Sequence, residues 1–550
     1  MRHPWRAFFT HSTIALAQPT YLAVRYLIDH QYFRRVHPAW FAVTAVSWYW
    51  IITRITIPFF TNPLRYVPSP PGENFPLCHL DTNGGRPPTD IITNLFKNTP
   101  NDGLIVAWLP FYLWAQVMPT RPDTLMDLLN THNYDWEKPA EMNKFIGRTI
   151  GEGLIVAEGD KHKAMRKAVA PAFSGRHIRD LVPLFYTKGS DFADSLARQT
   201  KQSADGSVEI MGQMSHVTLD IIGAAGVGKD FKTIENDQDP LAKLYATLTD
   251  ENRGPVLLFY FITAWMPAWF IRRLRGTVYA RFDEARIRLR EDARALMREK
   301  KQMMLDKPEQ QKDIIATIMR SGDFSDDYLV DQLLTFLAAG HDTTASALTW
   351  TIWLLCMHPE IQERLRAECN AHLADKPASE VDATTFDSET MPYLTAVCNE
   401  TLRHHPSVTA TVRNSVRPTM IGPYHIPAGT PALIAPWAIN RDPALWGDDA
   451  HEYNPDRWLN GPNAANGGAQ SPLHLMTFIH GPRSCIGREF ARLEMKCLLA
   501  TLIKRFRFEV ADPDAKVEIG GSLTIKPHGG LRLRLHDLKA EVDSKTDATA

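Results

Sequence analysis

The sequence has little cysteine and almost no net charge. It carries six cysteines in 550 residues, and 61 Lys and Arg balance 62 Asp and Glu. The cysteines form no C-x-x-C pair and are too sparse for a disulfide framework, which argues against a small secreted scaffold and a zinc ribbon. The charge balance gives no sign of a nucleic-acid binder. Each cysteine therefore has to be judged by its own surroundings.

The sequence also lacks internal repeats and a dinucleotide-binding loop. Residues 223–228 (GAAGVG) are glycine-rich, but they do not have the G-x-G-x-x-G order and follow no predicted strand, so we expect them to end a helix. No flavin or NADPH domain is visible. Hydrophobic residues make up 44% and charged residues 22%, which supports a large buried core.

An apolar run near the N-terminus predicts a membrane anchor. Residues 39–60 are apolar or aromatic apart from Arg54, some hydroxyls and Pro58, which is long enough to cross a bilayer. A weaker apolar stretch covers 13–28. A buried amphipathic helix is the alternative. We expect an anchor region at 1–60, a proline-rich hinge at 61–72, one catalytic domain at 73–538 and a polar tail at 539–550.

The charges around the run bear on the orientation of this anchor. Arg25, Arg34 and Arg35 precede the run, which by the positive-inside rule places the following domain in the lumen. We nevertheless predict that this domain lies in the cytosol, at the endoplasmic reticulum. A second apolar stretch at 255–271 is interrupted by Pro267. It fits either a loop that dips into the membrane or a buried helical hairpin.

Most of the catalytic region has the pattern of helices. Helices are expected at 279–304, 327–357, 361–374, 392–404 and 486–506, with short β-prone pieces at 423–427, 431–435, 506–510 and 523–526. The fold class predicted is therefore mostly α with a small β region.

One cysteine lies in a motif with five fixed positions. Residues 478–487 read FIHGPRSCIG, which matches F-x-x-G-x-R-x-C-x-G. A helix-like run follows Cys485, so the dipole and free N–H groups of the helix favour a thiolate. Gly481 and Gly487 allow close approach of a flat macrocycle, and Arg483 can pair with a carboxylate on it.

This segment, including Phe478, resembles the haem-binding loop of the cytochrome P450 monooxygenases, and of fungal microsomal members in particular. The resemblance implies the cytochrome P450 fold, a haem b (iron protoporphyrin IX) cofactor and Cys485 as the ligand of its iron. Residues 339–344 (AGHDTT) resemble the family's oxygen-activation motif in a long central helix. Asp342 and Thr343 are then the catalytic residues that deliver protons to bound dioxygen.

Other family landmarks occur in the expected order. Glu400 and Arg403 match E-x-x-R and, with Arg457, resemble a buried structural network that holds the cysteine loop. His162 and Arg166 resemble the propionate-binding helix, where tryptophan often stands at the position of His162. Arg413, before a β-prone segment, matches a further propionate-binding arginine. The resemblance therefore assigns His162, Arg166, Arg413 and Arg483 to the cofactor.

The resulting prediction is a monooxygenase that inserts one oxygen atom from O2 into a lipophilic small molecule, by hydroxylation or a related oxidation, within fungal secondary metabolism. With no flavin or NADPH domain in the chain, electrons are expected from a separate protein, NADPH-cytochrome P450 reductase. Because this donor faces the cytosol, we place the catalytic domain there against the charge rule. We expect contact with a membrane but no nucleic acid. Two alternatives remain open. One is a haem-thiolate isomerase or dehydratase acting on a peroxide, and the other is a haem sensor without enzymatic activity.

Overall fold

The structure is a computed structural model that describes residues 46–49, 52, 61–71, 88–108, 115–236, 278–373, 376–521 and 523–540. The chain divides into two compact units. The first comprises residues up to Trp136 together with Arg413–Ile434, and the second comprises Glu137–Val412 together with residues from Ala435 onward. The predicted domain boundaries stay a prediction, since the anchor, most of the hinge and the tail lie largely outside the described residues.

The first unit contains a small mixed sheet. Its strand order is β1-β2-β8-β5-β3, with β1 and β2 antiparallel and β2 and β8 parallel. A separate antiparallel hairpin joins β6 to β7. The bounds are α5 (Pro88–Lys97), β1 (Leu104–Trp108), β2 (Ala115–Pro119), α6 (Pro122–Met126), β3 (Trp136–Glu137), β5 (Thr411–Ser415), β6 (Thr419–Ile421), β7 (Tyr424–Ile426) and β8 (Pro431–Ile434).

The second unit is mostly helical. Its helices are α7 (Ala140–Ile150), α8 (Gly159–Val169), α9 (Gly175–Arg179), α10 (Val182–Gln202), α11 (Ile210–Val227), α15 (Val278–Asp306), α16 (Ile314–Ser321), α17 (Asp326–Met357), α18 (Pro359–Leu373), α19 (Pro392–His404), α20 (Pro436–Ile439), α21 (Pro443–Trp446) and α22 (Arg488–Arg505). An antiparallel sheet has the order β4 (Ser207–Glu209), β12 (Arg532–Asp537), β9 (Phe506–Val510), and a short pair joins β10 (Ile519–Gly520) to β11 (Lys526–Pro527).

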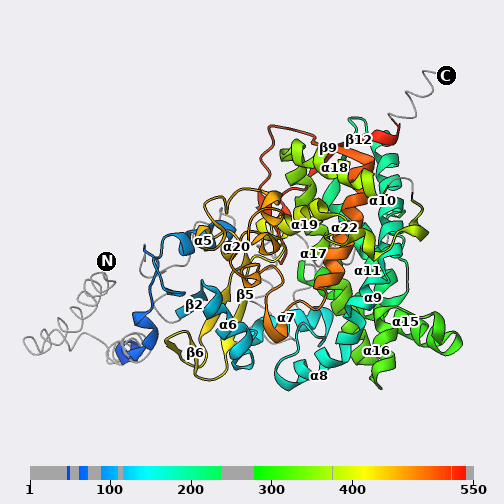
Figure 1. Cartoon of the computed structure of the whole chain (residues 1–550). Helices are drawn as coiled ribbons and strands as arrows, with labels where there is room; N and C mark the ends of the chain where they lie inside the picture. The colour runs from blue at the N-terminus through cyan, green and yellow to red at the C-terminus, as the bar shows by residue number, and fades with distance from the viewer. Residues whose placement is uncertain are drawn as a thin grey trace, which may run out of the picture. The chain divides into compact units, whose positions relative to one another are not determined.

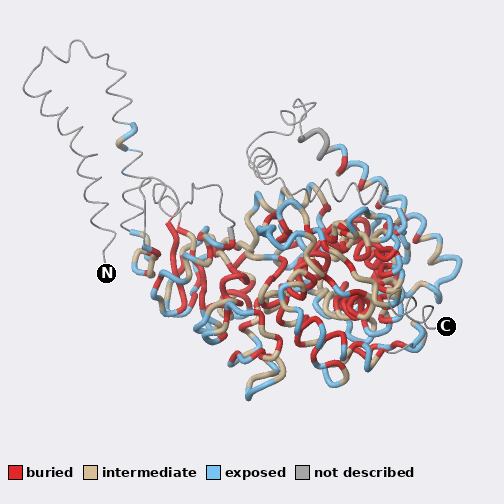
Figure 2. Tube along the Cα trace, turned by 90° about the horizontal axis from the view of Figure 1, so that it is seen from above, coloured by how far each residue is buried: buried red, intermediate tan, exposed pale blue. Residues whose placement is uncertain are grey.

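The long helix α17 runs through the core of this unit. It packs against α11, α15, α19 and α22, and the largest hydrophobic cluster forms around it (Figure 1). Figure 2 shows the buried residues concentrated in the inner helices, whereas α15 has many exposed residues along its length. The helix begins where Ser325 accepts a hydrogen bond from the Tyr328 amide, and it ends before Pro359, which starts α18.

Most of the sequence-based helix predictions are confirmed to within a few residues. The helix at 392–404 agrees with α19 at both ends, and the glycine-rich segment 223–228 does end α11, at Gly228 in the left-handed conformation. Prolines and caps fix these ends locally, which explains the agreement.

Two local predictions differ from the structure. The helix after Cys485 is confirmed but begins two residues later than expected, at Arg488, because residues 481–483 form a 3-10 turn and Gly487 is the N-cap. The strand expected at 523–526 is confined to Lys526 and Pro527. Residues Thr524 and Ile525 direct their polar groups to α17 and its neighbourhood instead of to a partner strand.

The predicted membrane segments are not tested. The apolar runs 13–28, 39–60 and 255–271 lie outside the described residues, apart from 46–49 and 52. Within the part of the chain that the structure describes, no helix has both the length and the apolar composition needed to span a bilayer.

Candidate active site

The loop that carries Cys485 is held by its own backbone. The Cys485 N–H donates to the Phe478 carbonyl at 2.9 Å, and the Ser484 N–H donates to the Gly481 carbonyl at 3.0 Å. Gly481 has φ +76° and Ile479 has φ +46°, a conformation that is unfavourable for a β-branched residue. Backbone of this kind persists only where the surroundings fix it, and it is typical of functional loops.

Opposing effects act on the Cys485 thiol. Cys485 forms no disulfide, and part of the residue is exposed to solvent. Many protein atoms nevertheless surround its thiol group. Burial raises the pKa of the Cys485 thiol, whereas a hydrogen bond from the Gly487 backbone and the positive charges of Arg166 and Arg488 act to lower it. The net shift is upward, so binding of a metal by this sulfur would have to release a proton.

Helix α8 fastens the loop from one side. Arg166 Nη1 donates to the Ser484 carbonyl at 2.7 Å, and Nη2 approaches Ser484 Oγ at 3.3 Å. Arg483 forms an ion pair with Glu158, the N-cap of α8, and Glu158 also accepts from Lys138 Nζ at 3.2 Å. His162 is buried on the same helix. Three of the four predicted cofactor cations, namely His162, Arg166 and Arg483, therefore lie on or against α8.

The predicted oxygen-activation motif forms an open face on α17. Most of this helix between Leu329 and Leu355 is buried, but Ala339 is exposed, and Ala338, Gly340 and Thr343 are only half-buried. Thr343 Oγ donates to the Ala339 carbonyl at 2.9 Å. A Cβ on Gly340 would come within 2.8 Å of Ile222 on α11, so glycine is required for the close packing of the two helices here.

Phe173 connects the two parts of the site. Its ring packs edge-on against Phe336 of α17, with ring centroids 5.3 Å apart. On its other side, the Phe173 ring lies 3.9 Å from the position of a Cβ on Gly487. Because Gly487 follows Cys485 by two residues and Phe336 precedes Ala339 by three, the cysteine loop and the open face of α17 belong to one region.

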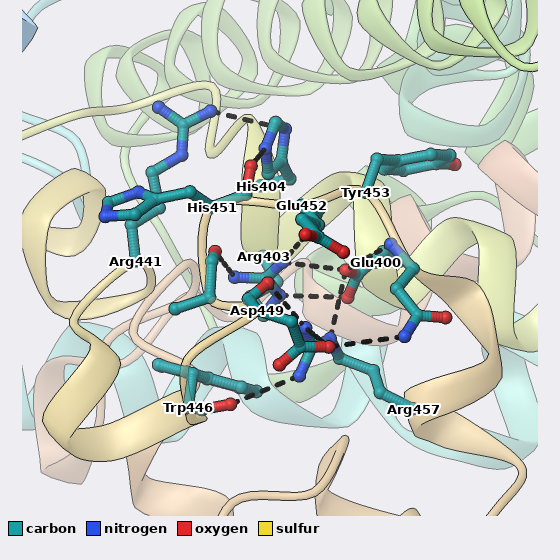
Figure 3. A network of polar contacts seen from close by, with 12 residues as sticks. Glu400, Arg403, His404, Arg441, Trp446, Asp449, His451, Glu452, Tyr453 and Arg457 are labelled. Carbon is teal, nitrogen blue, oxygen red and sulfur yellow. Dashed lines mark hydrogen bonds and ion pairs between the residues drawn. The ribbon is translucent and has the colours of Figure 1, made fainter.

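A fully buried charge network lies behind the cysteine loop. Glu400 accepts from Arg403 Nε at 2.9 Å and Nη2 at 2.7 Å, and from Arg457 Nε at 3.1 Å. It also accepts from the Trp458 indole and the Asn454 backbone, both at 2.9 Å. Figure 3 shows Glu400 between the two guanidinium groups. With every charged group paired, burial of this network is tolerable.

This network continues to the cysteine loop through Asn440. Arg403 Nη1 donates to the Asn440 carbonyl at 2.8 Å, and the Asn440 side chain accepts from the Met476 amide at 2.8 Å. Thr477 closes the connection, since its Oγ donates to the Leu402 carbonyl at 2.6 Å. The end of α19 therefore fixes the residues that directly precede Phe478.

Comparison with known proteins identifies the family. The family model described as Cytochrome P450 matches residues 86–531. The chain belongs to the cytochrome P450 family. Its resemblance to fungal members is confirmed as well, because similar proteins come from Aspergillus fumigatus, Gibberella moniliformis and Alternaria alternata.

These relatives cover most of the chain. Cytochrome P450 monooxygenase sphH of Aspergillus fumigatus is 38% identical over 485 residues, which is 86% of this chain and 88% of the relative. Cytochrome P450 monooxygenase FUM15 of Gibberella moniliformis is 33% identical over 89% of this chain and 91% of its own length. Cytochrome P450 monooxygenase ALT8 of Alternaria alternata is 31% identical, with 87% and 90% covered. The prediction of a P450 monooxygenase is confirmed.

The residues of this P450 fit the haem-thiolate cofactor of the family. An accessible thiol stands in a tight glycine-containing loop, arginines lie beside it, and the neighbouring central helix leaves a small-residue face open. Arg413 lies in the first unit, on β5, where burial lowers its pKa to about 10. Its assignment to a propionate stays a prediction from the sequence.

Three residues near this site were missed by the sequence analysis. Glu158 pairs with Arg483, Lys526 pairs with Asp342, and Glu494 of α22 is fully buried beside Thr344 of α17. The sequence carries a signal only for Glu494, as a charged residue within the apolar part of a predicted helix. The other two pairings join segments that are distant in the sequence.

Proposed function

We propose that this P450 binds haem b through Cys485 and hydroxylates, or oxidises in a related way, a lipophilic small molecule. The observation that carries the proposal is the accessible Cys485 thiol next to the open Ala339–Thr343 face of α17. When bound, the haem supplies the activation of O2, and the thiolate donates electron density that favours O–O cleavage. The protein supplies the ligand, the anchoring cations and the proton path.

Cofactor anchoring falls to the cations around the loop. Arg166 and Arg483 are fixed by Ser484 and Glu158, so their guanidinium groups are oriented before a propionate arrives. His162, which lies on α8 together with Arg166, is the third candidate for binding a propionate. Phe478, Gly481 and Gly487 complete the assignment as the residues of the loop that approach the macrocycle.

Proton delivery is assigned to two neighbouring residues of α17. Thr343 holds a hydroxyl proton at Oγ on the open face of the helix, where it can hydrogen-bond to a substrate oxygen atom. Asp342, the adjacent residue, carries the carboxyl group that would supply protons to it through water. A peroxide isomerase needs no such pair.

The proposed substrate is lipophilic because the exposed side chains near the site are apolar. Ala339, Val408 and Leu523 are exposed, the last at 56%. Fungal secondary metabolism is the proposed context, supported by the fungal origin of the similar monooxygenases. We further propose NADPH-cytochrome P450 reductase as electron donor and an anchor in the endoplasmic reticulum with the catalytic domain in the cytosol, supported by the apolar run 39–60.

The test of Cys485 is the absorbance spectrum of the reduced carbon monoxide complex. We expect the thiolate-type band in the wild-type protein and in Cys356→Ser, a control at a half-buried cysteine, but not in Cys485→Ser. A thiolate-type band in Cys485→Ser would contradict the proposal. The substrate is tested by comparing the metabolites of a deletion strain with those of its parent, where an accumulated lipophilic precursor is expected.

A further inference from the structure

The carboxyl group of Asp342 is engaged on both oxygens by one short C-terminal segment. Lys526 Nζ lies 2.7 Å from Asp342 Oδ1, and Thr524 Oγ donates to Oδ2 at 2.5 Å. All three side chains are buried, with Asp342 6% and Lys526 7% exposed. Asp342, the acid to which proton delivery is assigned, is therefore held in an ion pair with a residue that is distant in the sequence.

The charges around Asp342 keep it ionised. Burial raises the pKa of the Asp342 carboxyl, but the charges of Lys526 and His341 and the hydrogen bonds from Lys526 and Thr524 together outweigh burial, and the net shift of the pKa is downward. The other titratable neighbour, His341, is buried, its Nδ1 lies 2.7 Å from the Leu337 carbonyl, and burial lowers its pKa, with His216 acting in the same direction. A paired carboxylate has no proton to give, so it has to leave Lys526 before it can act as an acid.

The segment that provides Lys526 is also linked, through Ser407, to Thr343 on the open face of the site. Its Ile525 carbonyl accepts from Ser346 Oγ at 2.6 Å, and the Ile525 amide donates to the Ser407 carbonyl at 2.9 Å. Ser407 Oγ in turn donates to the Thr343 carbonyl at 2.8 Å. Leu523, three residues before Lys526, exposes its apolar side chain. The five-residue stretch 523–527 thus carries both an exposed apolar side chain, that of Leu523, and the counter-ion of Asp342, Lys526.

We propose that Lys526 is a positioning residue that restrains proton delivery, and that substrate contact with Leu523 loosens the Lys526–Asp342 pair. Once released, Asp342 takes up a proton from water, passes it towards Thr343 and becomes a carboxylate again, which re-forms the pair with Lys526. One proton enters and one leaves, so the chain is unchanged after each transfer. The inference rests on the proposed roles of Asp342 and Thr343.

The first experiment reads the protonation of Asp342 directly, without substrate. In Lys526→Met the buried Asp342 carboxyl loses its cation, and we expect an additional infrared carbonyl stretch of a protonated carboxylic acid, beyond the one that protonated Glu494 contributes in the wild type. The double variant Lys526→Met with Asp342→Asn should lose that band. Lys526→Arg, which restores the charge, and Lys504→Met, whose lysine donates to the Leu373 carbonyl elsewhere, should match the wild type.

The second experiment measures how strongly Lys526 restrains proton delivery. Without substrate, Lys526→Met should oxidise NADPH to peroxide and water roughly tenfold faster than the wild type, because proton delivery is no longer held back. Lys526→Arg should return the rate towards the wild-type value. If Lys526→Met does not retain haem, both measurements are made on Lys526→Gln, whose side chain is neutral but still offers a hydrogen-bond donor. The expected results are the same.

The outcomes separate this inference from the proposed function. If the neutral Lys526 variants show no additional carboxyl band relative to the wild type and no faster NADPH oxidation, while Asp342→Asn still alters peroxide release, Lys526 has no positioning role and the proton route stands. If neither Asp342→Asn nor Thr343→Ala changes peroxide release, the proton route itself is wrong, and a role for Lys526 falls with it.

Discussion

Arg403 donates two hydrogen bonds to Glu400, its neighbour one helical turn earlier on α19, and both side chains are wholly excluded from solvent. The same spacing occurs where Glu363, which is 71% exposed, pairs with Arg366, a buried residue that also donates to Gln362 and to two backbone carbonyls. The two pairs look alike in the sequence and differ in burial, so they offer a direct measure of what burial adds.

Glu400→Ala should lower the free energy of unfolding by about 3–5 kcal/mol, because it strands the charges of Arg403 and Arg457 in the core. Glu363→Ala should cost less than about 1 kcal/mol, because Glu363 is exposed and Arg366 keeps its hydrogen bonds to Gln362 and to the Ile503 and Phe506 carbonyls. Denaturant titration and the yield of haem-loaded protein measure both effects. Equal stabilities of the two variants would show that the Glu400 network does not hold the fold.

Arg166→Leu should weaken haem retention. It removes charge-assisted hydrogen bonds to Ser484, worth about 1.5–3 kcal/mol, and a positive charge that favours the Cys485 thiolate. The rate of haem transfer to an apoprotein acceptor should rise, and part of the reduced carbon monoxide complex should shift from the thiolate-type to the thiol-type band. Lys163→Leu, on the same helix and paired with exposed Asp160, is the control and should leave both unchanged.

Thr343→Ala should keep haem but lose coupling. Its hydroxyl lies on the open face of α17, so with substrate bound the product formed per NADPH should fall about tenfold or more while peroxide release rises. Thr351→Ala, where the same kind of hydroxyl donates to the Ala347 carbonyl in the buried part of the helix, should stay coupled. Unchanged peroxide release in Thr343→Ala would remove Thr343 from the proton path.

Glu494→Gln should make the protein less sensitive to alkaline pH. Burial raises the pKa of Glu494 well above its usual value, so the folded protein keeps a proton that the unfolded chain releases above about pH 4.3. From there up to the folded pKa, stability falls by about 1.4 kcal/mol for each pH unit. Urea titrations at about pH 6 and about pH 8 should show a smaller loss in Glu494→Gln than in the wild type.

The exposed neighbour on α22 provides the control for this prediction. Glu489→Gln should follow the wild-type dependence on pH, because Glu489 is exposed. A Glu494→Gln variant that loses as much stability as the wild type between the two pH values would show that the Glu494 carboxyl is already ionised in the folded protein.

The sequence by itself determined the features that depend on near neighbours. The helix at 392–404 is bounded by Pro392 and the E-x-x-R turn, and residues 478–487 carry the thiol, the glycines and Arg483 within ten positions. Such signals are local, because caps, turns and i,i+3 spacing act within a few residues. The family and the monooxygenase class followed from the same segments.

Only the tertiary structure decided which polar side chains that are distant in the sequence meet. Asp342 faces Lys526, Arg483 faces Glu158 and Glu494 faces Thr344, although nothing in the spacing of these residues predicts the pairs. The strand expected at 523–526 was wrong for the same reason, since Thr524 and Ile525 bond to residues of α17. A buried charge or backbone group takes the partner that helix packing brings to it, and that packing is a property of the whole core.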